Sequence, residues 1–73
     1  MAEPDELYVT VRDDGWAVKR GGREKAWRVL PTQAESIQLA RNTLADGGGG
    51  WLNIQNRDGQ WRERVWVGPR KRR

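Results

Sequence analysis

The sequence predicts an α+β domain: an antiparallel β-sheet built from two hairpins, with one α-helix packed on one face. Three observations predict it. Apolar and polar residues alternate near the start of the chain, as in half-buried strands. One central segment has helical periodicity and a helix start signal. Asp-Gly pairs, which favour tight hairpins, lie in both halves of the chain. The predicted order of elements is β-β-(β)-α-β-β.

The size and composition of the chain limit what it can be. Its 73 residues suffice for one domain with a marginal core. The chain contains five tryptophans, no phenylalanine, and neither cysteine nor histidine. Without disulfides or the usual zinc ligands, the core has to rely on large aromatic side chains or on self-association. We therefore expect no metal and no cofactor. No apolar run is long enough for a signal peptide or a membrane span, so a cytoplasmic location is expected.

The charge of the chain is concentrated at its end. The formal net charge of +4 comes from 14 basic and 10 acidic residues. The last four residues are all basic, so the remaining body is close to neutral; they are Arg70, Lys71, Arg72 and Arg73. We divide the chain into a flexible acidic N-terminus (1–6), a single α+β domain (7–68) and a basic C-terminal tail (69–73).

The first half of the domain is predicted to consist of strands joined by turns. Residues 7–12 alternate apolar and polar side chains, and the Asp-Asp-Gly turn at 13–15 leads into a second strand over 16–20. Trp16 and Val18 are expected on its inner face. A second turn at 21–25 precedes a short third strand over 26–30, which Pro31 ends.

The predicted helix has clear start and stop signals. Thr32 and Glu35 form a capping box, and the glycine run at 47–50 ends the helix after Asp46. This glycine run follows a helix, whereas a phosphate-binding loop would precede one. The sheet-facing side of the helix is predicted to carry Ala34, Ile37, Ala40 and Leu44. Leu39 is predicted to point away from the core.

The second hairpin comprises residues 51–56 and 60–67 and turns on Asp58-Gly59. The favoured register pairs Leu52 with Val65 and Ile54 with Glu63 on the helix-facing side. On the other side it pairs Trp51 with Trp66, Asn53 with Arg64, and Gln55 with Arg62. Trp61 is expected near the turn, on the core side. Glu63 would then need a partner, and Arg41 on the helix is the candidate for an ion pair.

Several short motifs, taken in order, resemble those of a small bacterial family, domain of unknown function 2188. They are Gly15-Trp16-Ala17-Val18-Lys19, Thr32-Gln33-Ala34-Glu35, Ala40-Arg41, Arg57-Asp58-Gly59 and Arg62-Glu63. The resemblance extends over residues 7–68 and implies one compact α+β domain. It supplies no activity, and no functional residues can be carried over from it.

Enzymatic chemistry is not expected of this sequence. Ser36 is the only serine and lies on the predicted helix, with no histidine to act as its base. The carboxylates lie at turns, at the helix cap or beside arginines, where structural roles explain them. We therefore expect a domain that binds and does not catalyse.

The face of the sheet opposite the helix is the candidate binding surface. Aromatic rings that stack on bases, amides that read base edges and cations that neutralise phosphates meet there, which favours DNA or RNA binding. The candidate residues are Tyr8, Arg12, Lys19, Trp51, Asn53, Gln55, Arg62, Arg64 and Trp66, with Arg70, Lys71, Arg72 and Arg73 of the tail. The alternative is a protein-interaction or homodimerisation module, because Trp, Tyr and Arg also dominate interface hot spots.

Overall fold

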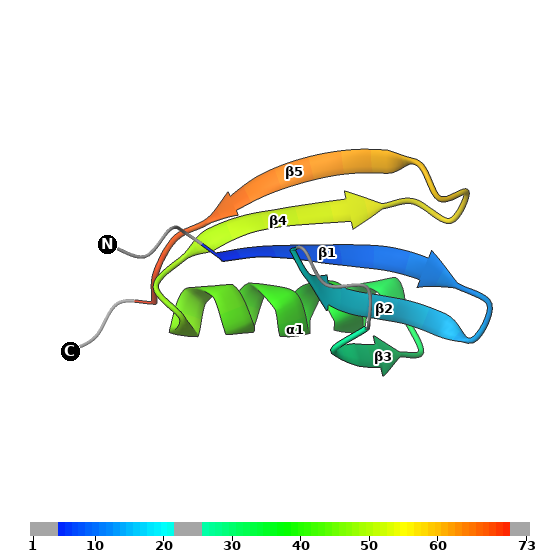
Figure 1. The fold of residues 1–73 in the computed structure, drawn as a ribbon, viewed down its shortest axis with the longest axis horizontal. Helices are drawn as coiled ribbons and strands as arrows, with labels where there is room; N and C mark the ends of the chain where they lie inside the picture. The colour runs from blue at the N-terminus through cyan, green and yellow to red at the C-terminus, as the bar shows by residue number, and fades with distance from the viewer. Residues whose placement is uncertain (1–4, 22–25, 71–73) are drawn as a thin grey trace.

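A computed structural model describes residues 5–21 and 26–70. Its elements are β1 (Asp5–Arg12), β2 (Gly15–Arg20), β3 (Arg28–Leu30), α1 (Gln33–Asp46), β4 (Gly50–Gln55) and β5 (Trp61–Val67). The strands form one five-stranded sheet, and α1 lies across one of its faces (Figure 1). The predicted α+β class and element order are confirmed.

The sheet is mixed, whereas the sequence predicted an antiparallel one. The strand order is β3-β2-β1-β4-β5, and the central pair β1–β4 is parallel. The other neighbours are antiparallel. The reason is the helix: it carries the chain back along the sheet after β3, so β4 starts at the same end as β1 and runs beside it, as in a crossover connection.

Both ends of the domain extend beyond the predicted limits. Asp5 and Glu6, assigned to the terminal segment, belong to β1 and pair with Gly50 and Trp51 of β4. At the other end, the Arg70 backbone N–H donates to the Ala45 carbonyl at 2.9 Å. Part of the expected second turn (22–25) and the tail residues Lys71, Arg72 and Arg73 lie outside the described residues.

The core lies between the sheet and α1. It contains alternate residues from the three central strands and two helix residues: Leu7, Val9, Trp16, Val18, Leu52, Ile54, Ala40 and Leu44, with Val67 from β5. Trp16 and Val18 are buried, as predicted. Gly50 lets β4 approach its neighbours closely, because a Cβ there would collide with the Asp5 carbonyl oxygen and with Leu44 Cδ2.

The helix begins and ends where the sequence indicates. The Glu35 N–H donates to Thr32 Oγ1 at 3.1 Å, and Gly47 is the C-cap residue.

The buried stripe of α1 differs from the predicted one. It consists of Ser36, Ala40 and Leu44, spaced by four residues. Ala34 is exposed, so its predicted inward position was wrong. Leu39 packs partly against the core, contrary to prediction. Ser36 is tolerated inside because its hydroxyl donates to the Thr32 carbonyl at 3.1 Å.

The β4–β5 hairpin has the predicted register only in the part that lies away from its loop. The pairs Trp51–Trp66, Leu52–Val65, Asn53–Arg64 and Ile54–Glu63 are confirmed, but Gln55 faces Trp61 and not Arg62. The Asn56 N–H donates to the Gln60 carbonyl, so the loop contains the three residues 57–59, with Gly59 at φ +83°. A β-bulge beside Gln55 absorbs the extra residue, Arg62.

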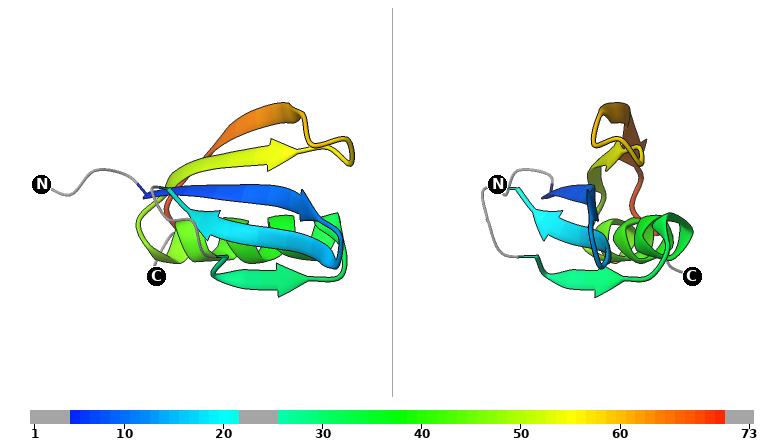
Figure 2. Two further views of the ribbon diagram at one scale, coloured as in Figure 1. Left: turned by 45° about the vertical axis from the view of Figure 1, so that its right-hand side comes forward. Right: turned by 90° about the vertical axis from the view of Figure 1, so that its right-hand side faces the viewer.

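β5 is an edge strand that stands partly away from the helix. The views in Figure 2 show the β4–β5 hairpin rising beyond the part of the sheet that α1 covers. Accordingly, most β5 side chains are exposed, and only Val67 is buried. No helix in the described ranges has the length and apolar character needed to cross a membrane.

Candidate functional site on the open face of the sheet

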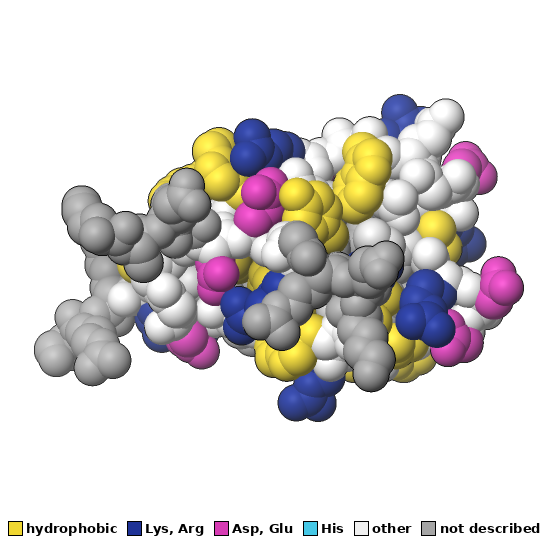
Figure 3. Space-filling view, viewed as in Figure 1, with side chains coloured by type: hydrophobic (Ala, Val, Ile, Leu, Met, Phe, Trp, Pro, Cys, Tyr) yellow, Lys and Arg dark blue, Asp and Glu magenta, His cyan; other side chains and the backbone are white. Residues whose placement is uncertain are grey.

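The open face is the side of the sheet opposite α1. Strand register assigns to it Glu6, Tyr8, Thr10, Lys19, Trp51, Asn53, Gln55, Trp61, Arg64 and Trp66. Figure 3 views this side and shows hydrophobic side chains in several places, with basic and acidic groups between them. The surface is therefore a mixture of aromatic and charged groups.

Arg64 is the centre of one cluster on this face. Its guanidinium carbon lies 4.2 Å from the Trp51 ring centroid, and its Nη2 lies 3.3 Å from Glu6 Oε2. The Trp51 and Trp66 rings meet edge to face with centroids 5.2 Å apart. These contacts hold the arginine by a cation–π interaction and an ion pair. The predicted Trp51–Trp66 pair is thus present, and Arg64 lies beside it.

The amides of the open face bond to the protein itself. Asn53 is buried, and its Nδ2 donates to Glu6 Oε2 at 2.8 Å and to the Leu7 carbonyl at 3.3 Å. Gln55 accepts from the Val11 N–H at 3.1 Å and donates to the Gly59 carbonyl at 2.9 Å. Both amides therefore stabilise the sheet and the hairpin loop.

Trp61 lies on the open face, and its predicted position on the core side was wrong. Its ring meets Tyr8 edge to face, with centroids 5.5 Å apart, and its side chain is 53% exposed. The cause is the three-residue loop, which moves Trp61 one position along the ladder to face Gln55. The sequence signal was present in Gly59, since a three-residue loop commonly ends in a glycine at positive φ.

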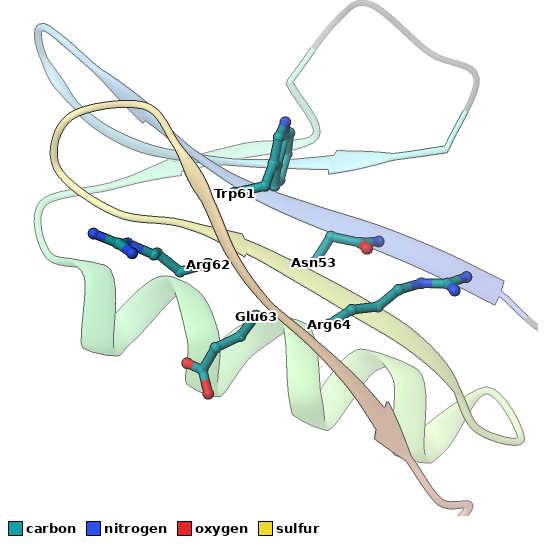
Figure 4. A pocket seen from close by; sticks show the side chains of 5 residues that line it. All are labelled: Asn53, Trp61, Arg62, Glu63 and Arg64. Carbon is teal, nitrogen blue, oxygen red and sulfur yellow. The ribbon is translucent and has the colours of Figure 1, made fainter.

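Two neighbours of Trp61 also depart from the prediction. Arg62 occupies the bulge, and Figure 4 shows its side chain pointing away from Trp61, Asn53 and Arg64. Glu63 lies on the helix-facing side but is exposed. Among the ion pairs of the described residues none joins Glu63 to Arg41, so that expectation was wrong. An exposed carboxylate needs no partner, because water solvates it.

A shallow hollow lies beside Trp61. Its volume is about 290 Å³, and Asn53, Trp61, Arg62, Glu63 and Arg64 line it. In Figure 4 Trp61 stands at one side, Arg64 at the other, and Asn53 lies between them. The hollow is therefore lined by an exposed indole, two arginines, one carboxylate and a buried amide.

The remaining predicted residues are spread around the fold. Lys19 is half-buried and faces Tyr8 across β1–β2. Arg12 is exposed at the end of β1, and its Nε pairs with Asp14 at 3.1 Å. Arg70 lies beside the end of α1, where its Nε bonds Asp46 Oδ1 at 2.6 Å. The first basic residue of the tail is thus attached to the helix, away from the hollow.

Comparison with known families places the chain in one of them. The model of a family described as "Uncharacterized protein conserved in bacteria (DUF2188)" matches residues 7–65. The chain belongs to this family. The match covers β1 to most of β5, so the sheet and the helix described above are the family's domain in this chain. No curated protein and no solved structure matches the chain.

Proposed function

We propose that this member of the family is a non-enzymatic nucleic-acid-binding domain that uses the open face of its sheet. The observation that carries the proposal is the presence of two half-exposed indoles, Trp61 and Trp66 at 53% and 47%, on one strand with Arg64 between them. Every nucleobase has a planar face that can stack on such rings, and arginine adds attraction for phosphate.

The electrostatics of the face support this proposal. Among the open-face residues that the structure describes, Glu6 is the acidic one, and Arg64 and Asn53 both contact it. Glu63 also lines the hollow, from the helix-facing side of β5. Lys19 adds a second cation on the face, and Arg62 projects from the edge beside the hollow. The basic tail would contribute further, sequence-independent affinity that falls as salt rises. We propose a cytoplasmic site of action, where nucleic acid is accessible.

A mobility-shift assay combined with tryptophan fluorescence tests the proposal. The full chain is titrated with single-stranded and duplex oligonucleotides at low and moderate salt. We expect a retarded band, quenching of indole emission, and affinity that weakens with salt. Non-specific binding to nucleic acid typically has dissociation constants of about 1–100 μM. The proposal is therefore wrong if protein at roughly 50 μM gives neither a shift nor quenching.

A protein-interaction or homodimerisation module is the second candidate. Exposed tryptophan and arginine are the residue types that dominate interface hot spots, and Trp27 and Val29 add exposed apolar surface. Sedimentation of the chain alone distinguishes the two roles. A tight dimer that dissociates in Trp66→Ala or Arg64→Glu would assign the face to self-association; a monomer that binds oligonucleotides would exclude it.

A further inference from the structure

We infer that the ligand of the open face is a single-stranded nucleic acid, one base of which enters the hollow between Trp61 and Arg64. The inference rests on the proposed function and specifies the form of its ligand. It follows from the size and lining of the hollow, from the hydrogen bonds that Asn53 and Gln55 make within the protein, and from the position of Arg62.

The hollow suits one planar ring. Small-molecule pockets occupy roughly 300–1,000 Å³, so a hollow of about 290 Å³ lies just below that range. The exposed Trp61 indole lines one side and Arg64 lines the other, with the Arg64 guanidinium held against the Trp51 ring and Glu6. Unstacked bases stack on aromatic planes in single-strand recognition, so the Trp61 indole is the stacking surface and Arg64 supplies positive charge beside it.

A base within a duplex cannot use this hollow. Its two faces are already covered by neighbouring bases, and extruding it breaks both its pairing and its stacking. A sheet can instead read a duplex by placing side chains against base edges in the major groove. Asn53 and Gln55 are the amides available for that, and both are already bonded to the protein. The open face is therefore better suited to stacking than to reading a groove.

The bulge places a cation next to the hollow. Arg62 lines it but directs its side chain outward, away from Trp61 and Asn53 (Figure 4). In this inference, the phosphate of a base stacked on Trp61 lies on the outer side of the hollow, where Arg62 supplies positive charge. The bulge thus separates the roles of two neighbouring residues: Trp61 stacks, and Arg62 neutralises charge.

The test compares two ligands. Fluorescence anisotropy measures binding of the full chain to a labelled oligothymidylate of about 12 nucleotides, within the range that single-strand-binding folds cover. The second ligand is a blunt duplex of the same length. We expect the single strand to bind at least about tenfold more tightly, a difference of about 1.4 kcal/mol.

Variants identify the hollow as the site. Base stacking contributes about 1–3 kcal/mol, so Trp61→Ala should weaken binding of the single strand roughly 5- to 150-fold, while Trp61→Phe keeps part of the affinity. Trp27→Ala is the matched control, because Trp27 is 41% exposed but does not line the hollow. Circular dichroism of each variant checks that it is folded.

The outcomes separate this inference from the proposed function. Equal or tighter binding of the duplex contradicts the inference and leaves nucleic-acid binding in place. The inference is also contradicted if folded Trp61→Ala keeps the full preference for the single strand. The same holds if Trp27→Ala reduces that preference as much as Trp61→Ala does. In either case the base would bind elsewhere. Binding of neither ligand contradicts the proposed function itself.

Discussion

Trp61 lies against Tyr8, with their ring centroids 5.5 Å apart and the ring planes inclined by 74°. The contact reaches from β5 to β1 across the intervening strand β4. Leu7 and Val9, which flank Tyr8 in β1, are buried on the helix side, so Tyr8 points to the open face. Because Trp61 contacts Tyr8, it lies on the same face. The proposed binding role depends on this position, since a buried indole would offer no surface for stacking.

Removing the charge of Arg64 should reduce the salt dependence of oligonucleotide binding. For Arg64→Gln we expect the slope of log affinity against log salt to fall by about 0.7, the value for one phosphate contact to a single strand. Arg41→Gln is the control, because Arg41 is exposed on α1. Anisotropy titrations at several salt concentrations measure both slopes. An unchanged slope in Arg64→Gln would show that Arg64 does not contact phosphate.

Asn53 should matter for stability more than for base preference. Asn53→Ala removes two hydrogen bonds from a buried site, and we expect the free energy of unfolding to fall by about 1–3 kcal/mol. Asn42→Ala is the matched control: its amide is exposed and accepts one hydrogen bond, from Gln38. Urea denaturation measures both variants. Equal stability of the two would contradict the structural role of Asn53.

Gly50 should not tolerate a side chain. In Gly50→Ala the new methyl group would collide with the Asp5 carbonyl oxygen and Leu44 Cδ2. Overpacking of this kind lowers the free energy of unfolding by about 1–3 kcal/mol. The Asp5 carbonyl belongs to the backbone of β1, so it can shift little to make room for the methyl group. Gly68→Ala is the control, since a Cβ there meets nothing within 4 Å. Thermal unfolding followed by circular dichroism should show a clear decrease for Gly50→Ala alone.

The helix cap gives a prediction that tests the start of α1. Thr32→Ala removes the hydroxyl that accepts from the Glu35 N–H, and we expect a loss of about 1 kcal/mol in stability. Thr32→Ser should restore most of it, because serine retains the accepting oxygen. If both variants unfold at the same denaturant concentration, the hydroxyl does not cap the helix in solution.

The fold was largely predictable because its signals are local. Alternation marked the strands, Thr32 and Glu35 marked the helix start, and the pairing of Trp51 with Trp66 followed from the apolar pattern of the hairpin. The parallel pairing of β1 with β4 was not predictable in this way. Local periodicity describes the face that a strand buries, but it does not specify which strand lies beside it.

The candidate site was predicted less well, for a geometric reason. Asp58-Gly59 was interpreted as a two-residue turn, although the loop contains three residues. That difference moved Trp61 to the open face and Arg62 into a bulge. Ser36 was missed as a buried residue because its hydroxyl bonds back to Thr32, which hydrophobic periodicity does not register.

The most direct test of the central claim is a nuclear magnetic resonance titration of the ¹⁵N-labelled full chain with oligothymidylate. Each tryptophan gives one indole N–H signal, and single Trp→Phe variants assign them. The account predicts that the signals of Trp61 and Trp66 move with increasing ligand, while that of Trp16, buried in the core, does not. Saturating ligand that leaves the Trp61 and Trp66 signals unchanged would contradict the claim that the open face binds nucleic acid.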